Sequence, residues 1–284
     1  MLANMKKMLR DAKKGGYAVP AFNTQGGNYD MSWAVCEAAE KEKSPIILAH
    51  YDSCSEYAGL EFFVEISRWC AERVSVPVAI HLDHGNSVEL CKRAIDAGCT
   101  SVMYDGSVLP IEENARNTAE VLEYALPRGV SVEAEIGRVL QTAASDSSTI
   151  HANCADYADV ENFLSLAVPD ALAVAIGNAH GFYTEKPILN IDLLKRIQSQ
   201  FDVPLVLHGG TGIAVEDVQK AIRNGISKVN IGTEIRCNYV KYMFEGMQEM
   251  GLQEHAWKIS KRAIGLMEQD VQKTIEMCGS QGKA

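Results

Sequence analysis

The sequence predicts an α/β fold, a (β/α)8 TIM barrel with a C-terminal helical extension. Three observations support this prediction. Short apolar runs rich in β-branched residues alternate with longer amphipathic patterns along the 284 residues, as expected where each strand is followed by a helix. About eight such strands occur, the number that closes this barrel. Nearly every strand also ends in a polar or ionisable residue, and active sites of such barrels lie at the carboxyl ends of their strands.

The predicted elements follow one another without a linker. The strands are Tyr17–Asn23, Pro45–His50, Val78–Leu82, Thr100–Asp105, Val130–Ile136, Ala171–Asn178, Pro204–His208 and Lys228–Thr233. The helices between them include Asp30–Lys43, Leu60–Glu72, Ser87–Ala97, Ile111–Ala125, Asp156–Leu166, Ile191–Gln200 and Val215–Asn224. We therefore expect a single domain, residues 1–284, whose helical extension covers Lys241–Met277. A doubly wound open sheet is the alternative interpretation of the same alternation.

Composition and charge narrow the range of functions. The chain is 47% hydrophobic and carries a formal net charge of −10. This acidity argues against nucleic-acid binding, which needs a basic stripe, but not against a small anion held by backbone amides. The segment Met1–Arg10 predicts an amphipathic helix instead of a signal peptide, and no apolar run approaches the roughly 18 residues of a membrane span. The eight cysteines show no paired spacing, so we expect reduced thiols and a cytoplasmic location.

Three histidines end strand-like runs that are far apart in the sequence. His84, His180 and His208 each precede a glycine, which lets the backbone turn tightly and a ligand approach. Three imidazoles at strand ends fit a catalytic zinc that keeps one coordination position open for substrate. Co²⁺ or Fe²⁺ is an alternative, because affinity alone does not select among these metals. His151 and His255 are expected at the surface.

Acidic residues surround the predicted metal site. Asp83 adjoins one of the histidines and is the predicted acid/base catalyst on the substrate; the alternative is that it only orients the metal ligands. Asp105 and Glu135 end two further strands and are expected as partners of the histidines or occasional metal ligands. His81 lies three residues before His84, a spacing that places two side chains on opposite faces of an extended strand. We therefore expect a structural role for His81.

Glycine-rich segments end the last two strands. One is His208–Gly212 and the other is Asn230–Thr233. Barrel enzymes commonly bind phosphate with the loops after these strands, through backbone amides and a helix N-terminus. Either segment alone could be a tight turn, but the pair predicts a phosphate site.

Six motifs, in this order, resemble the class II (metal-dependent) ketose-bisphosphate aldolases: HLDHG, SVMYDGS, SVEAEIG, AIGNAHGFY, VLHGGTGI and KVNIGTE. The similarity runs from the segment around Asn23 to Ala284. The AIGNAHGFY motif is most similar to the tagatose-bisphosphate branch, with the fructose-bisphosphate and deoxy-phosphogluconate branches nearby.

The resemblance implies reversible cleavage of a ketose 1,6-bisphosphate, of tagatose or fructose type, to dihydroxyacetone phosphate and an aldehyde phosphate through a zinc-stabilised enediolate. It implies one Zn²⁺ per subunit at His84, His180 and His208, allows a monovalent cation, and assigns proton transfer at the aldehyde oxygen to Asp83. It also implies a homodimer or homotetramer. Substrate contacts are expected from Asn23, Gly181, Gly209, Gly210, Thr211, Asn230, Ile231, Gly232 and Thr233.

Two segments depart from the family pattern. The loop Arg138–Ser148 lacks the usual Gly-Gly-x-Glu-Asp, whose glutamate exchanges the proton of the enediolate. Asp146 is the only carboxylate of this loop, so we expect it to take that role. The tip of the second strand is His50–Ser53, where the family usually has a small hydroxyl residue, and this difference bears on sugar specificity.

Three further functions stay open beside the aldolase. One is a non-catalytic metal- and phosphate-binding relative that acts as a partner subunit or sensor, suggested by the missing loop glutamate. Another is a different barrel enzyme, such as an isomerase, that uses the same metal. The last is an aldolase for another phosphorylated sugar. The presence of Asp83 beside all three histidines favours an aldolase, because a protein that only binds has no need of the acid.

Overall fold

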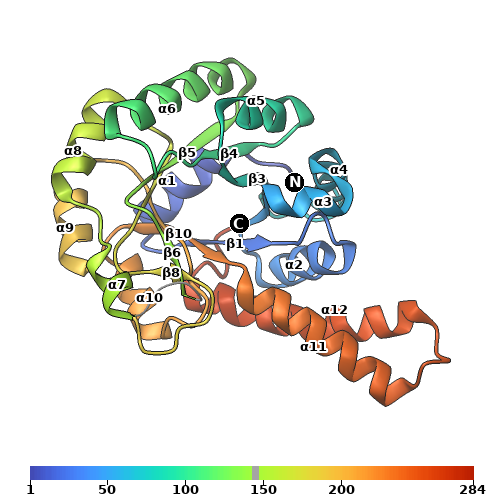
Figure 1. Ribbon diagram of the computed structural model, residues 1–284. Coiled ribbons are helices and arrows are strands. Elements are labelled where there is room, and N and C mark those ends of the chain that lie inside the picture. Colours follow the sequence, from blue (N-terminus) through green and yellow to red (C-terminus); the bar gives the residue numbers. More distant parts are fainter. Residues whose placement is uncertain (143–146) are drawn as a thin grey trace.

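The computed structural model describes residues 1–142 and 147–284, without the side chains of Ser147 and His151. Eight parallel strands close into a barrel in the spatial order β1, β10, β9, β7, β5, β4, β3, β2 (Figure 1). The predicted fold class is confirmed, and the open-sheet alternative is wrong because β1 pairs with both β2 and β10. The barrel strands are β1 (Val19–Asn23), β2 (Ile46–Tyr51), β3 (Val78–Gly85), β4 (Ser101–Tyr104), β5 (Ser131–Ile136), β7 (Ala171–Val174), β9 (Leu205–Leu207) and β10 (Ile226–Ile231).

Helices cover the outside of the barrel (Figure 1). Several begin at a side chain that caps the first backbone amides: Asn28, Ser87 and Asn190 each accept a hydrogen bond from an amide three residues later. The long outer helices are α2 (Tyr29–Glu42), α4 (Leu60–Ala71), α5 (Val88–Ala97), α6 (Ile111–Ala125), α8 (Tyr157–Leu166), α9 (Ile191–Gln200) and α10 (Val215–Ile222). Shorter elements are α3 (Ser55–Ala58), α7 (Ser147–Ala152) and the 3₁₀ turns η1 (Asp52–Cys54) and η2 (Leu126–Arg128).

The amino-terminal end of the barrel is closed by α1 (Met5–Gly15), the helix expected at the start of the chain. Its buried apolar face packs in one cluster with inward-facing side chains of five strands: Ala21, Ile47, Ala79, Ala173 and Val206. Because side chains alternate along a strand, these strands place their next inward-facing residues closer to the opposite, carboxyl end. The apolar floor therefore leaves the carboxyl end as the place for polar chemistry.

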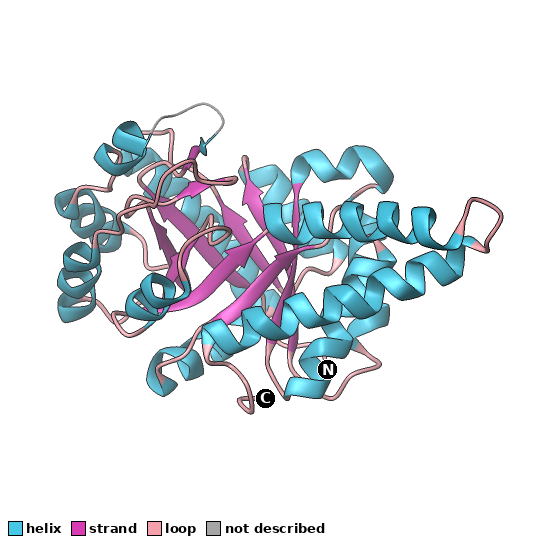
Figure 2. Ribbon diagram, turned by 90° about the horizontal axis from the view of Figure 1, so that it is seen from below, coloured by secondary structure: helices cyan, strands magenta, loops and turns pink. Residues whose placement is uncertain are grey.

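The helical extension is a hairpin of α11 (Thr233–Met250) and α12 (Ala256–Cys278) that projects from the barrel (Figures 1 and 2). The predicted start at Lys241 is wrong, because α11 begins at Thr233, separated from the end of β10 only by its N-cap residue Gly232. The second helix returns to pack against α2 and buries Met267 and Val271 in the core. His255 precedes α12 and is exposed, as predicted. The side chain of His151 lies outside the described part.

The predicted strand Ala171–Asn178 is too long. It ends at Val174, because the chain turns at Gly177 (φ 90°) and Asn178 accepts a hydrogen bond from the amide of Ile176. A second, two-stranded sheet follows, formed by β6 (Leu140–Gln141) and β8 (Ala179–His180).

In the part of the chain that the structure describes, no helix is long and apolar enough to cross a membrane. All eight cysteines are free thiols.

Candidate active site and metal centre

A pocket with a volume of about 830 Å³ opens at the carboxyl ends of the barrel strands. Many of its walls come from residues that the sequence singled out: Asn23, Asp83, His84, Asp105, Glu135, His180, Gly232 and Thr233. Others were not singled out, among them Gln25, Asn86, Ser107 and Arg236, while Leu140 and Gln141 belong to the loop that departs from the family pattern. The barrel thus gathers side chains from distant strands at one end, as its topology requires.

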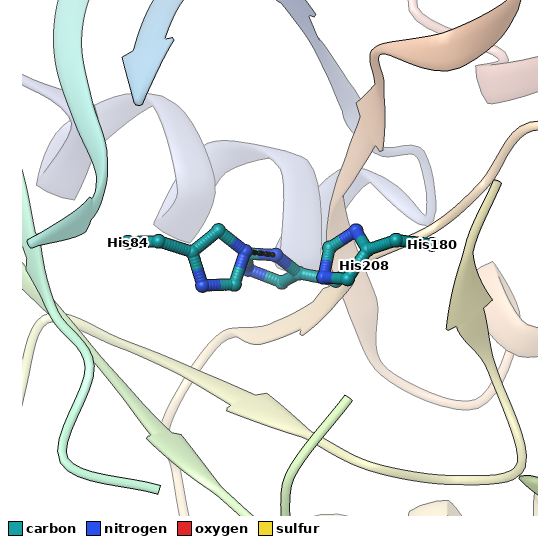
Figure 3. Close-up of side chains that lie close together, drawn as sticks. All are labelled: His84, His180 and His208. Carbon is teal, nitrogen blue, oxygen red and sulfur yellow. Dashed lines mark hydrogen bonds between the residues drawn. The ribbon is translucent and has the colours of Figure 1, made fainter. Parts of the chain in front are cut away.

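The three predicted histidines meet beside this pocket (Figure 3). The ring centroids of His84 and His208 are 4.7 Å apart, those of His84 and His180 are 5.0 Å apart, and those of His180 and His208 are 5.9 Å apart. One nitrogen of each ring lies within 4.8 Å of the other two. Three converging imidazoles are a donor set that suits zinc and related divalent metals. The residues present therefore fit a metal ion.

His84 reaches the pocket through a break in its strand. Its φ is 53°, and the register between β3 and β4 shifts between Leu82 and Gly85. A positive φ is uncommon for a residue with a side chain, and here it turns the ring to the mouth of the barrel. The expectation that His81 and His84 lie on opposite faces is wrong, because His81 points into the barrel interior and the alternation stops before His84.

A carboxylate orients the His84 ring. Nδ1 of His84 donates a hydrogen bond to Oδ2 of Asp105 at 2.8 Å, and Nε2 of His84 therefore faces the other imidazoles. Burial opposes charge on His84, but Asp83, Asp105 and Glu135 outweigh it and raise its pKa to about 10. Burial and the neighbouring His84 and His208 lower the pKa of His180 to about 3. The ring is therefore neutral at neutral pH and has a nitrogen lone pair that can bind a metal.

Tyr183 and Asn178 fix the other two histidines through the backbone. The Tyr183 hydroxyl accepts a hydrogen bond from the Ala179 amide at 2.7 Å and lies 3.1 Å from the carbonyl of Gly209. It thereby joins the short strand of His180 to the loop after His208. The Asn178 side chain donates to the carbonyl of His208 at 2.9 Å. Neither residue was predicted, since a side chain that holds backbone leaves no periodic signal.

Asp83 is a buried, oriented carboxylate at the centre of the site. It is 2% exposed and accepts hydrogen bonds from Asn23 Nδ2 at 2.9 Å and Asn230 Nδ2 at 3.1 Å. Its Oδ1 lies 4.0 Å from His84 Nε2 and 4.0 Å from His208 Nδ1. Burial disfavours its charge, but these histidines and Lys228 outweigh it and hold the pKa of Asp83 well below its usual value. The carboxylate is therefore ionised in this arrangement.

Asp105 and Glu135 stand on either side of His84 with different partners. Asp105 also accepts hydrogen bonds from the amide and the hydroxyl of Ser107. Burial alone would raise the pKa of Asp105, but His84 and the hydrogen bonds from Ser107 outweigh burial and hold this pKa below its usual range. Glu135 accepts from the Val139 amide at 3.1 Å, while its Oε2 has no hydrogen-bond partner among the described residues and lies 4.0 Å from His84 Nδ1. Burial and the nearby Asp105 raise the pKa of Glu135 to about 7. His84, Asp105 and Glu135 also bring one ligand atom each within 4.8 Å of one another.

Sequence reasoning missed a charged group beneath the histidines. Glu133 accepts a hydrogen bond from His208 Nε2 at 2.9 Å, and Lys228 lies 2.7 Å from the other oxygen of Glu133. A signal existed: side chains alternate along a strand, so Glu133 shares a face with Glu135, and Lys228 shares one with Asn230. Both were recognisable as inward-facing from their spacing to predicted site residues.

The glycine segments lie where the two last strands meet α11. Gly232 and Thr233 line the pocket, and the first amides of α11 begin there. Gly209 has a φ of 61°, and a Cβ on it would lie 2.0 Å from the carbonyl oxygen of Ala179, so only glycine fits. Thr211 Oγ1 accepts from the Glu234 amide at 3.3 Å and thus joins the two segments. The Gly210 amide donates to the carbonyl of Asn230 at 3.0 Å, which holds the same two segments together. Substrate contacts at Gly181, Gly210, Asn230 and Ile231 stay predictions.

Of the two segments that depart from the family pattern, the structure describes the tip of the second strand fully and the loop Arg138–Ser148 only in part. Tyr51 and Ser53 reach the pocket wall, whereas His50 is 1% exposed and stacks on Phe63 with ring centroids 4.8 Å apart. Asp146 lies outside the described residues.

Comparisons with known proteins agree with this geometry. Residues 3–283 match the family described as Fructose-bisphosphate aldolase class-II. The chain is 44% identical over 247 residues to a fructose-bisphosphate aldolase of Geobacillus stearothermophilus, covering 86% of this chain and 85% of that one. It is 43% identical over 239 residues to a fructose-bisphosphate aldolase of Staphylococcus epidermidis, covering 82% of each.

Solved structures give the same result. The YdjI aldolase of Escherichia coli superposes with a TM-score of 0.87 at 34% identity over 100% of both chains. A fructose-bisphosphate aldolase of Campylobacter jejuni, 21% identical, shares the fold with a TM-score of 0.77, covering 100% of this chain and 97% of that one. With the barrel, the histidine cluster and these relatives in agreement, the chain belongs to the class II fructose-bisphosphate aldolases, a family of metal-dependent lyases that act on phosphorylated sugars.

Proposed function

We propose that the protein reversibly cleaves a ketose 1,6-bisphosphate, of fructose or tagatose type, to dihydroxyacetone phosphate and an aldehyde phosphate, with one zinc ion per subunit. The observation that carries this proposal is the environment of Asp83, an ionised carboxylate held by two asparagines beside three histidines. A protein that only binds metal and phosphate gains nothing from such a base. This favours catalysis over a non-catalytic role as partner subunit.

His84, His180 and His208 would hold the ion. A bound divalent metal supplies positive charge that stabilises negative charge developing on substrate oxygens. The protein contributes the orientation of the rings, which Asp105 and Glu133 provide through hydrogen bonds at 2.8 and 2.9 Å. Glu135 would be a further metal ligand at the edge of the cluster, because its Oε2 has no hydrogen-bond partner among the described residues.

Asp83 is the proposed base in the cleavage direction. It removes the proton from the hydroxyl on carbon 4, the bond between carbons 3 and 4 breaks, and its electrons leave the three-carbon phosphate as an enediolate. In the condensation direction the same carboxyl returns the proton to the aldehyde oxygen. Asn23 and Asn230 hold Asp83 with their amide nitrogens, and their Oδ1 atoms have no partner among the described residues. Those oxygens are available to substrate hydroxyls.

The pocket wall offers two kinds of anion contact, which suits a substrate with two phosphates. Backbone amides at Gly232 and Thr233, where α11 begins, form one. The guanidinium groups of Arg138 and Arg236 form the other. We assign the dihydroxyacetone phosphate end to the amides, together with the glycine segment after His208, and the aldehyde phosphate to the arginines.

A carboxylate is also needed to exchange the proton on the enediolate carbon. We propose Asp146 for this role, since it is the carboxylate of the loop that follows β6. Glu135 is the competing candidate on a specific observation: its pKa is raised to about 7 by burial and then by Asp105, near the value that suits a general base at neutral pH.

The hairpin of α11 and α12 supports the proposed homodimer or homotetramer. It exposes large apolar side chains, among them Val240, Phe244, Leu252 and Trp257, at 62%, 59%, 89% and 61%. Exposed apolar patches of this kind mark protein interfaces. Light scattering after size exclusion checks this: Phe244→Glu should reduce the measured mass toward the monomer. We also infer a cytoplasmic location, which the eight free thiols support.

A cleavage assay tests the proposed function. Metal-loaded enzyme is given fructose 1,6-bisphosphate, tagatose 1,6-bisphosphate and related phosphorylated ketoses, and release of triose phosphate is followed. The proposal expects cleavage of one of the two bisphosphates. If the enzyme cleaved only another phosphorylated sugar, the proposed substrate would be wrong but the aldolase activity would be confirmed. Absence of cleavage with all of them, in protein that holds its metal, would contradict it.

A further inference from the structure

A polar layer inside the barrel lies beneath the metal-binding histidines and takes no part in the proposed proton transfers. We call it the interior layer and define it as His81 on β3, Ser101 on β4, Glu133 on β5 and Lys228 on β10. Each has an exposed fraction of 0%. Buried charges are costly unless they are paired and hydrogen-bonded. Every polar side chain of this layer has such a partner.

Lys228 sets the direction of the hydrogen bonds on one side of the layer. An ammonium group can only donate, and Lys228 Nζ lies 3.1 Å from His81 Nε2. His81 therefore accepts at Nε2 and donates from Nδ1 to Ser101 Oγ at 2.7 Å. The Ser101 hydroxyl is then left to donate to Met5 Sδ at 3.3 Å, at the floor of the barrel. The chain of donors and acceptors has a single consistent arrangement.

The same reasoning reaches the metal site on the other side. Lys228 Nζ lies 2.7 Å from Glu133 Oε2, and Glu133 Oε1 lies 2.9 Å from His208 Nε2. A carboxylate can only accept, so Nε2 of His208 carries the proton. The other nitrogen, Nδ1, lies 3.0 Å from His84 Nε2 and is the one that faces the cluster. His84 is set in the opposite sense, with its Nδ1 on Asp105 and Nε2 toward the cluster.

We propose that Lys228 and Glu133 are a positioning pair that presents His208 to the metal through Nδ1. Lys228 holds the carboxylate, and the carboxylate fixes the tautomer and the rotation of the ring. This inference rests on the metal site of the proposed function and is independent of the sugar. Lys228 itself is enclosed and ion-paired at 2.7 Å, which is unlike the accessible neutral amine that a Schiff-base lysine needs.

Glu133→Gln is the sharpest variant, because an amide has one acceptor oxygen where the carboxylate has two. Lys228 can only donate, so it takes that oxygen and turns the amide NH₂ toward His208 Nε2. His208 must then accept at Nε2 and carry its proton on Nδ1, where the metal should bind. We expect the zinc dissociation constant, measured by competition with a chromophoric chelator, to rise about 10- to 100-fold.

Removing the lysine as well should reverse this effect. In Glu133→Gln with Lys228→Met, the amide is free to offer its oxygen to His208 and restore the parent tautomer. The dissociation constant should then return most of the way to the parent value. Lys6→Met is the matched control, since it breaks an ion pair of equal length, 2.7 Å to Asp170, on α1. It should leave the dissociation constant unchanged.

Two results would overturn the positioning pair. One is a Glu133→Gln variant that binds zinc as tightly as the parent, and the other is a double variant that binds no better than the single one. Circular dichroism and thermal unfolding of the metal-free variants establish that each is folded. If a variant fails to fold, ¹⁵N spectra of the histidine rings in the zinc-loaded parent decide: the proposal requires the proton of His208 on Nε2 and the metal on Nδ1, and the reverse contradicts it. Substrate is absent throughout, so a failed cleavage assay would count against the proposed function alone.

Discussion

Glu133 and Glu135 lie two residues apart on β5, both point into the barrel, and their exposed fractions are 0% and 1%. Burial disfavours charge on Glu133, but Lys228 and the hydrogen bond from His208 outweigh it and lower its pKa to about 2. Burial, and then the charge of Asp105, raise the pKa of Glu135 to about 7. Equal burial therefore gives opposite pKa shifts, because Glu133 has the Lys228 ammonium at 2.7 Å, whereas Glu135 Oε2 has no hydrogen-bond partner among the described residues and lies 4.0 Å from His84 Nδ1.

The same contrast separates two layers of the barrel. Every polar side chain of the interior layer has a hydrogen-bond partner, within the layer or in His208 and Met5 next to it. The mouth layer, which we define as Asp83, His84, Asp105, Glu135, His180 and His208, keeps ring nitrogens and a carboxylate oxygen turned toward the pocket. Open ligand and acceptor atoms in a buried place are unfavourable for stability and are typical of sites that bind and react. The predictions below test this division, from the largest effect to the smallest.

Replacing a metal ligand of the mouth layer should abolish function. In His84→Ala, His180→Ala or His208→Ala, the bound metal measured by mass spectrometry of the dialysed protein should fall close to zero, and cleavage should disappear with it. Thermal unfolding should still show a folded barrel, because the apolar floor is untouched. His255→Ala, on the exposed hairpin loop, should change nothing. A variant that loses cleavage but keeps one equivalent of metal would remove that histidine from the ligand set.

Asp83→Asn separates acid/base chemistry from metal binding. The side chain keeps its shape and loses its charge, so metal content should stay near the parent value. Turnover should fall roughly 10²- to 10⁴-fold, the usual contribution of a general acid/base. Turnover is measured at saturating metal. Loss of metal with only a mild loss of turnover would reassign Asp83 to orienting the metal ligands.

Asp146→Asn tests the proton exchange proposed for the loop. Exchange of solvent deuterium into dihydroxyacetone phosphate, followed by NMR, should slow by on the order of 10²-fold, while the inhibition constant of a phosphate-bearing analogue stays the same. Unchanged exchange in this variant, together with slower exchange in Glu135→Gln, would transfer the role to Glu135.

The stability of the metal-free protein should report the raised pKa of Glu135. Between about pH 4.5 and pH 7, the folded chain holds a proton on Glu135 that the unfolded chain has released. The contribution of Glu135 to the free energy of unfolding should therefore fall as pH rises through this window, by on the order of 1–3 kcal/mol. Buried histidines with lowered pKa values, such as His180, contribute a rise over the same range, so the contribution of Glu135 is measured as a difference between variants. In urea titrations at several pH values, the free energy of unfolding of the parent minus that of Glu135→Gln should fall between about pH 4.5 and pH 7. The same difference for the exposed Glu161→Gln should stay constant. A difference between the parent and Glu135→Gln that stays constant from pH 4.5 to pH 7 would contradict the raised pKa of Glu135.

Glu133 should change the pH dependence of the free energy of unfolding in the opposite direction. Its lowered pKa means that the unfolded chain takes up the proton first as pH falls below about 4.5. Its stabilising effect is thus present above that pH and is lost as pH falls toward 2. The two glutamates of one strand should therefore produce slopes of opposite sign in separate pH windows.

The sequence predicted the barrel and the three histidines because both depend on local patterns. Strand and helix periods, and glycines after histidines, are visible in single segments of the chain, and the closed topology then brings the segments together. The phosphate segments after β9 and β10 were predictable for the same reason. Their contacts with a phosphate are still predictions.

The remainder depends on contacts between segments. The turn of His84 to the mouth requires a φ of 53° and a shift of register, neither of which alternation predicts. The early end of β7 depends on Asn178, whose side chain bonds to the amide of Ile176 and to the carbonyl of His208. The pairing of Glu133 with Lys228 joins strands that are not neighbours in the barrel. Such long-range pairs appear only once the barrel is closed.

A metal titration of the cleavage reaction tests the central claim most directly. Zinc is added in steps to the metal-free protein, and the rate of dihydroxyacetone phosphate release from the better of the fructose and tagatose bisphosphates is measured at each step. The account predicts a linear rise that stops at one equivalent of zinc per chain, and no rise in His208→Ala. Cleavage by the metal-free parent, or a rise that His208→Ala retains, would contradict a reaction that depends on the three histidines.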